Sequence, residues 1–231
     1  FIVAWSRFAI ATVLILPLTG LKIREFRHFL DWRVLIRGSL ITAAIFCMIT
    51  ALKTESIANV FGAFFIGPIV SYLLAVLFLK ERPTKLQTML LIVGFTGVMV
   101  VVKPGFGATV GIGIGLLAGT FYGAYLASTK LIAGEFRPKF LLISQLIIGS
   151  VILSPIGLSL DLELPELDMN ISLLLIGSAV FSAAGNLLLV VANRMAEASL
   201  IAPLIYSQLI FAVIFGVLIF NDWPDFLSII G

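Results

Sequence analysis

Polar side chains within the long apolar stretches of this sequence are the residues that could recognise a solute. Ser178, Ser182 and Asn186 are spaced by four residues, so they share one face of a helix. Gln145 lies about two turns into another apolar stretch. Hydroxyl and carboxamide groups can hydrogen-bond a polar solute, and they can equally hydrogen-bond a neighbouring helix. Solute binding by Asn186, Ser182 and Gln145 is one interpretation, and helix packing is the other.

Aromatic residues form a second group of candidates. Tyr122 and Tyr125 lie near the middle of one apolar stretch, and Tyr206 and Gln208 lie near the middle of another. A tyrosine has an apolar ring and a polar tip, which suits a solute that combines both characters. We therefore treat all four residues as candidate solute contacts. The alternative for each tyrosine is a packed ring whose hydroxyl reaches a carbonyl.

Arg7 is a basic residue about two turns into the first apolar stretch. A charge at membrane depth is a candidate for solute binding or gating, although a long side chain near a helix end can also reach water. Pro68 and Pro203 interrupt two further stretches. Because proline removes a backbone hydrogen bond and kinks a helix, these residues are candidate gating hinges, and static kinks are the alternative.

The amino-acid composition indicates whether these residues belong to a water-soluble protein or to a membrane protein. Of the 231 residues, 61% are hydrophobic and 12% are charged, whereas soluble domains average about 45–50% and 25%. This excludes a water-soluble globular fold and a disordered chain. The net charge of +3 does not indicate nucleic-acid binding, because basic residues collect in the cytoplasmic loops of membrane proteins.

The sequence lacks the residues that a metal site or an enzyme active site would need. One cysteine and one histidine provide neither a disulfide nor a metal site, and no cofactor is expected. An intramembrane enzyme would need a convergent nucleophile, an acid–base pair or a metal cluster, so we expect no catalytic residues. No Asp or Glu lies in the middle of a predicted span, which favours facilitated diffusion or exchange over proton coupling.

Apolar stretches separated by short polar segments predict an all-α polytopic membrane protein. Helices are expected because an open sheet cannot satisfy its backbone groups in lipid. A ninth span begins near residue 225. The eight complete spans are predicted near 1–19, 33–52, 57–79, 84–102, 110–133, 139–158, 170–193 and 198–220.

The loop charges predict the topology. Twelve of the fifteen basic residues fall on one side of the predicted membrane, including those in the loops 20–37 and 80–85. The other side carries most of the acids, among them Asp161 and Glu163. The positive-inside rule makes the basic side cytoplasmic and puts residue 1 on the outer side of the plasma membrane. A bacterial inner membrane is the expected location.

Three weak internal matches indicate a repeat with nearly constant offset. The loop 20–37 is basic whereas its repeat partner near 157–171 is acidic, so equivalent loops lie on opposite sides of the membrane. This predicts an inverted repeat of two five-helix bundles, 1–105 and 106–231, the first without its first helix and the second with a truncated last helix. The matches are VLILPLTG (13–20) with VILSPIGL (151–158), Gly38-Ser39 with Gly177-Ser178, and VLFLKERP (76–83) with VLIFNDWP (217–224).

The sequence resembles the EamA-type members of the drug/metabolite transporter superfamily over essentially its whole length. The segments 51–87 and 192–225 carry most of the resemblance, since each combines a short turn, a Pro-bearing helix and an acid two residues before a proline. The resemblance implies ten helices in two inverted halves and a carrier of small metabolites. The matching residues are Glu81 and Pro83, Asp222 and Pro224, Arg7, Phe8 and Ala11, and Lys103-Pro104-Gly105.

We therefore predict a secondary-type exporter, exchanger or facilitator of a small organic metabolite that works by alternating access. The solute would bind near the middle of the bilayer, between the two halves. A structural or regulatory membrane protein without transport is the alternative, and an intramembrane enzyme is a weaker one. Glycines at every fourth position from Gly111 to Gly123 predict close helix packing, either inside one protomer or at the interface of a homodimer.

Overall fold

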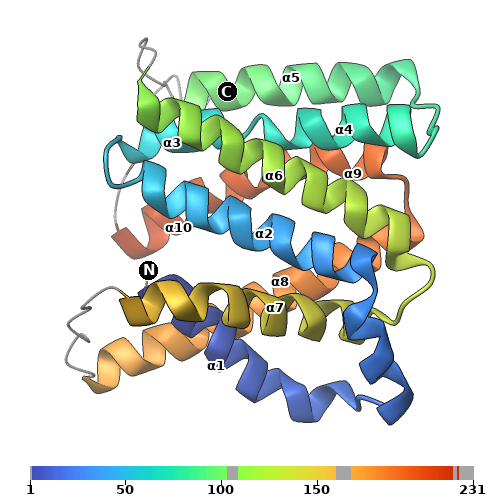
Figure 1. The fold of residues 1–231 in the computed structure, drawn as a ribbon. Helices are drawn as coiled ribbons and strands as arrows, with labels where there is room; N and C mark the ends of the chain where they lie inside the picture. Colours follow the sequence, from blue (N-terminus) through green and yellow to red (C-terminus); the bar gives the residue numbers. More distant parts are fainter. Residues whose placement is uncertain (1, 103–108, 160–167, 221–222, 224–231) are drawn as a thin grey trace. The chain divides into compact units, whose positions relative to one another are not determined.

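The computed structural model describes residues 2–102, 109–159, 168–220 and 223, and within them it contains helices and no strand (Figure 1). The first half comprises α1 (Ile2–Thr19), the 3₁₀ helix η1 (Ile23–Leu30), α2 (Trp32–Ala51), α3 (Ile57–Phe64), α4 (Gly67–Phe78) and α5 (Lys85–Val102). The second half comprises α6 (Val110–Ala133), α7 (Pro138–Ser159), α8 (Met169–Met195), α9 (Ala198–Leu204), the 3₁₀ turn η2 (Ile205–Ser207) and α10 (Gln208–Phe220).

The helices confirm the prediction of an all-α polytopic membrane protein. In the described residues, 7 helical segments are long and apolar enough to cross a bilayer, and a shorter apolar helix covers Trp5–Thr19. Two predicted spans are interrupted: α3 and α4 are separated at residues 65–66, and η2 divides α9 from α10. The predicted start of a ninth span near residue 225 lies outside the described residues.

The predicted basic loop 20–37 is shorter in the structure. Residues Ile23–Leu30 form η1, and α2 begins at Trp32, so Arg33 and Arg37 belong to a membrane-spanning helix. Asp31 starts this helix, because its Oδ1 accepts a hydrogen bond from the backbone N–H of Arg33 at 2.9 Å. A side-chain acceptor of this kind satisfies one of the free N–H groups of the first turn.

The chain forms two compact units, and each unit combines two separate segments. Unit 1 contains residues 1–46 and 128–195, and unit 2 contains 47–127 and 196–231. Each unit therefore draws on both predicted sequence repeats. We describe the units separately.

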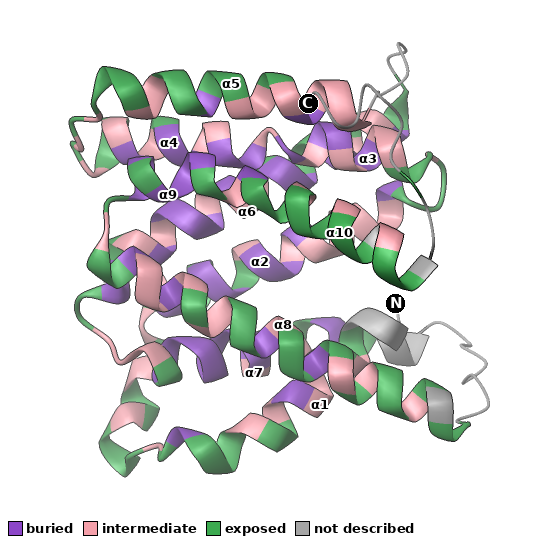
Figure 2. Cartoon of the chain, turned by 180° about the vertical axis from the view of Figure 1, so that it is seen from behind, coloured by how far each residue is buried: buried purple, intermediate pink, exposed green. Residues whose placement is uncertain are grey.

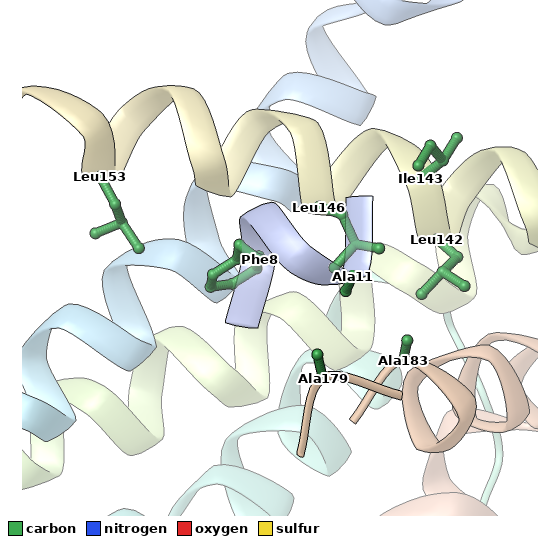
Figure 3. Packing of buried hydrophobic residues seen from close by; sticks show 8 residues of the cluster. All are labelled: Phe8, Ala11, Leu142, Ile143, Leu146, Leu153, Ala179 and Ala183. Atoms are coloured by element: carbon green, nitrogen blue, oxygen red, sulfur yellow. The ribbon is translucent and has the colours of Figure 1, made fainter. Parts of the chain in front are cut away.

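Unit 1 is built around the first helix. Phe8 and Ala11 of α1 pack between leucines of α7 and the small residues Ala179 and Ala183 of α8 (Figure 3). A Cβ at Gly149 of α7 would lie 2.7 Å from the Phe8 ring, so only glycine lets the ring reach the α7 backbone. Burying one phenylalanine contributes roughly 1.5–3 kcal/mol.

The start of α7 covers the end of α1. Gly20, with a φ of +55°, ends α1 in the left-handed conformation that favours glycine. Arg137 donates from Nη2 to the Thr19 carbonyl at 2.9 Å and forms an ion pair with Glu25 at 3.1 Å. Lys139 donates to the Leu18 carbonyl at 3.1 Å. Cations at a helix C-terminus satisfy its free carbonyls and complement the helix dipole.

Unit 2 has a core between α3–α4, α5 and α9–η2. Its buried members are Phe65, Tyr72, Leu91, Val98, Ala202 and Tyr206. The opposite side of α5 is exposed (Figure 2), and Met89, Ile92 and Val93 on it are apolar. An exposed apolar helix face is expected where a helix contacts lipid rather than water.

Glycines bring α6 against the break between α3 and α4. A Cβ at Gly119 would lie 2.5 Å from the carbonyl oxygen of Phe64, and one at Gly67 would lie 2.9 Å from the carbonyl oxygen of Gly119. Gly115 faces Ala63 and Val60, whereas the space around Gly113 is open to 4 Å. Within unit 2, the ridge at Gly115 and Gly119 therefore packs inside one protomer, as small-residue stripes do in membrane helices.

Candidate functional site

Unit 1 contains a cavity of about 60 Å³ among α1, α2, α7 and α8. Four of the predicted solute-binding residues line it: Arg7, Gln145, Ser182 and Asn186. The remaining lining side chains are apolar: Phe8, Ala11, Ile41, Ile45 and Leu146. The structure thus brings a polar candidate of α1 together with candidates of α7 and α8, which come more than a hundred residues later in the sequence.

Asn186 and Ser182 are positioned by the backbone of α8. The side-chain nitrogen of Asn186 donates to the carbonyl of Ser182, four residues earlier, at 2.8 Å. Ser182 and Asn186 both line the cavity, but Ser178, on the same predicted stripe, is exposed and does not. Asn193 is buried and donates to the Leu189 carbonyl at 2.9 Å. The polar stripe therefore reaches the cavity only in its middle part.

Gln145 is held from behind by Arg37. Arg37 lies in the second turn of α2 with 0% of its surface exposed. It donates from Nη2 to Oε1 of Gln145 at 2.7 Å and from Nε to the hydroxyl of Thr129 at 2.9 Å. A third bond runs from Nη1 to the Leu141 carbonyl at 2.9 Å. Because a guanidinium has donors only, it fixes the orientation of the Gln145 carboxamide.

Sequence reasoning missed Arg37 because it lies close to a run of basic loop residues. The signal that could have identified it was its position: the predicted span begins at residue 33, so Arg37 is more than one turn inside. An arginine at such a depth is a candidate functional or network residue by default.

Arg7 differs from Arg37 in its surroundings. It is exposed, and it forms no hydrogen bond or ion pair with the residues that the structure describes. A cation in a membrane-spanning segment is costly unless it finds a partner or water. The side chain of Arg7 is therefore available to a ligand of the cavity.

Tyr206 belongs to unit 2, where it lines an apolar groove of about 640 Å³ between α5 and α9–α10. Its hydroxyl donates to the carbonyl of Phe65 at 3.2 Å, and its ring packs on Phe65. Phe65 lies at the break between α3 and α4, where backbone acceptors lose their helical donors. Gln208 is exposed at the start of α10 and does not line this groove.

Tyr122 and Tyr125 stack on each other with ring centroids 6.1 Å apart, within unit 2. Tyr122 also packs on Phe64, at 5.0 Å, and Tyr125 has 0% of its surface exposed. These contacts describe packed aromatics. Whether either tyrosine also contacts a solute stays a prediction.

The two candidate hinge prolines are both at helix breaks of unit 2. Pro68 occupies the first turn of α4, where its missing N–H has no cost. Pro203 is the last residue but one of α9, and η2 follows that helix directly. Both helices are thus interrupted, and their use in gating stays a prediction.

Two carboxylates hold loops of unit 2. Glu81 accepts hydrogen bonds from the backbone N–H groups of Ala198 and Ser199, both at 2.9 Å, and so caps α9. Lys80 precedes it with a φ of 56°, a turn that ends α4. Glu55 accepts hydrogen bonds from the Thr109 hydroxyl and from Asn59. These bonds, that of Thr109 foremost, lower the pKa of the Glu55 carboxyl.

The fold and the cavity define a class: a polytopic α-helical membrane protein with a polar cavity among its helices. The chain belongs to the EamA-like transporter family, which matches it over residues 1–103 and 109–231. The fold resembles that of a protein of known crystal structure over the whole chain and 82% of that protein, with a TM-score of 0.82 and 13% identity.

Named relatives agree with the family. A riboflavin transporter of Brucella anthropi is 27% identical over 100% of this chain and 85% of its own length. Human solute carrier family 35 member G1 is 27% identical over 86% of this chain, which spans only 58% of that protein. An uncharacterized transporter of Helicobacter pylori is 25% identical over 95% of this chain and 76% of its own length. These relatives imply a small-molecule substrate and favour a transporter over an enzyme.

Proposed function

We propose that this protein carries a small organic metabolite across a plasma membrane by alternating access, as an exporter, exchanger or facilitator. The observation that carries the proposal is the cavity of unit 1, because polar side chains of α1, α7 and α8 converge there inside membrane-spanning helices. Polar groups at this depth are costly and mark solute pathways in transporters. The membership of the EamA-like transporter family supports the same function.

The lining of the cavity bears on energy coupling. It includes no Asp or Glu among the residues that the structure describes. A carrier that binds a proton at its solute site needs a titratable group there, and arginine does not lose its proton in proteins. Exchange or facilitated diffusion is therefore the mode that we propose.

The topology follows from the positive-inside rule. We propose that residue 1 lies on the outer side of a bacterial inner membrane, and that the segments 20–31 and 80–85 are cytoplasmic. Cysteines placed singly at Arg24 and at Asp168 test this orientation in intact cells. A membrane-impermeant maleimide should label the second and not the first, and the reverse pattern contradicts the orientation.

The transport test compares Asn186→Leu with Ser178→Leu. Both substitutions exchange a polar residue of α8 for leucine, but only Asn186 lines the cavity. In proteoliposomes loaded with a metabolite mixture, wild type and Ser178→Leu should exchange labelled solute, and Asn186→Leu should lose most of the flux. Equal flux in both variants refutes the site, and the absence of flux in wild type for every solute class tested refutes the carrier.

A further inference from the structure

We propose that η1, the 3₁₀ helix between α1 and α2, binds the headgroups of anionic phospholipids in the membrane leaflet beside it. The guanidinium groups of Arg24 and Arg27 would bind the phosphates, and the apolar side chains of Ile23 and Phe26 would enter the boundary of the acyl chains. No residue of η1 lines the cavity of unit 1, so the proposal goes beyond the transport function. Three features carry it: the position of η1, the contacts that hold it and the charges that it exposes.

The position of η1 is between two apolar helices of unit 1 (Figure 1). α1 ends at Thr19, and α2, which begins at Trp32, is long and apolar enough to cross a bilayer. A short segment between two such helices lies at a membrane surface. Trp32 is 65% exposed, and tryptophan is enriched at membrane–water interfaces. The proposed topology makes this surface cytoplasmic, where the leaflet carries anionic lipids.

One side of η1 is held by the start of α7. Residues three apart lie on the same side of a 3₁₀ helix, which puts Glu25 and His28 together. Glu25 forms an ion pair with Arg137 at 3.1 Å. The rings of His28 and Phe29 both pack edge-on against Phe140, with centroids 6.3 Å and 5.1 Å away. These contacts fix which sides of η1 remain exposed.

The two remaining sides of η1 differ in character. Ile23 and Phe26, three residues apart, share one side and are 90% and 60% exposed. Arg24 and Arg27 share the other side and are exposed as well. An apolar side next to a cationic side is typical of helices that lie in the plane of a membrane interface. Contact with the bilayer would bury the first side and leave the second at the level of the headgroups.

The charge of the cationic side is not neutralised by the protein. Arg24 and Arg27 form no hydrogen bond or ion pair within the described part of the chain, and Glu25, the acid of η1, is already paired with Arg137. A guanidinium binds a phosphate through two parallel hydrogen bonds. A second copy that brought the same cationic surface to η1 would be repelled. Anionic lipid is therefore the partner that the charge favours.

The experiment measures which lipid contacts η1 in a bilayer. Trp5→Phe and Trp223→Phe leave Trp32, two residues after η1, as the only tryptophan of the 231 residues. The intact protein with these changes is reconstituted in mixtures of phosphatidylcholine and phosphatidylglycerol with identical acyl chains, and one lipid at a time carries bromine on its chains to quench the tryptophan. Each basic residue near the surface contributes about 5-fold. Trp32 should therefore show a preference for phosphatidylglycerol of about 5- to 30-fold.

Two pairs of substitutions locate the effect. Arg24→Gln with Arg27→Gln should remove the preference, so that both lipids quench Trp32 equally. The protein should stay folded, because neither side chain has a partner within the described residues. The control pair, Arg82→Gln with Lys85→Gln, removes the same charge from another exposed segment and should leave the preference at Trp32 unchanged.

The possible outcomes decide the proposal. Equal quenching by both lipids before any arginine is changed overturns it, and so does a preference that survives Arg24→Gln with Arg27→Gln. Loss of the preference in the control pair overturns it too, because the effect would then depend on the total charge of the protein and not on η1. Quenching by neither lipid means that protein, for example a second copy, covers this surface, and it also overturns the proposal.

Discussion

Adding one methyl group at Gly119 tests whether glycine is needed where α6 meets the break between α3 and α4. The Cβ of an alanine would lie 2.5 Å from the Phe64 carbonyl oxygen and 2.7 Å from Cγ2 of Ile66, below the 3.0 Å that such contacts essentially never undercut. The nearest atom is backbone, so the two segments must separate. Gly113, on the same helix, has no atom within 4 Å of its Cβ position.

The expected magnitude follows from this comparison. Both substitutions remove a helical glycine and gain up to about 1 kcal/mol of helix propensity. Only Gly119→Ala adds overpacking, which costs typically about 1–3 kcal/mol. The difference between the two variants isolates the steric cost. At roughly 2–4 °C per kcal/mol for a chain of this size, Gly119→Ala should melt about 2–12 °C below Gly113→Ala.

The assay is thermal unfolding of the detergent-purified variants, followed by the fraction that elutes as monodisperse protein after heating. Gly113→Ala should melt at or slightly above wild type. If Gly119→Ala melts at the same temperature as Gly113→Ala, the close approach of α6 to the Phe64 carbonyl is wrong, and so is the packing explanation of the glycine ridge.

Three further predictions use the same assay. Arg37→Met removes the donor from three buried acceptors, so it should lower the stability of the folded protein by at least about 3 kcal/mol. The control Arg24→Met should not change the stability. Equal melting temperatures of the two variants would contradict the Arg37 network. Glu81→Ala uncaps two N–H groups of α9 and should cost about 1 kcal/mol; an unchanged melting temperature argues against the cap. The pKa of Glu55 is lowered in the folded protein, so its contribution is present above the ordinary carboxyl pKa and is lost as pH falls through the folded value. Acidification from about pH 6 to pH 3 should therefore destabilise wild type more than Glu55→Gln, and identical pH profiles would exclude this role.

The positions of the helices could be predicted from the sequence because the bilayer imposes their length. Runs of about twenty apolar residues correspond closely to α2, α5 and α6. Two other apolar runs, 57–79 and 198–220, contain a break in the structure. In the sequence, only Pro68 and Pro203 indicated these breaks. A proline indicates that a helix is perturbed, but the sequence does not show whether the helix kinks or stops. That outcome depends on which neighbouring groups satisfy the freed backbone groups. One example is the Tyr206 hydroxyl, which donates to the Phe65 carbonyl.

The candidate site could be predicted in part. Asn186, Ser182, Gln145 and Arg7 stood out because polar groups are rare in apolar helices, and the structure brings all four to one cavity. Their convergence depends on which helices are neighbours, which a single sequence does not contain. Arg37 was missed because it follows a run of basic loop residues, and its partners Thr129, Leu141 and Gln145, about a hundred positions later in the chain, could not be predicted either.

That separation has a consequence for biosynthesis. Arg37 enters the membrane with α2, yet its partner Gln145 is 108 residues further along the chain. At a synthesis rate of about 5–20 residues per second, this partner follows after roughly 5–20 s. During that interval the nascent helix carries a guanidinium without the groups that later surround it. A translocon or membrane chaperone would therefore have to shield this charge after α2 inserts, and translation pauses between the two segments would prolong that interval.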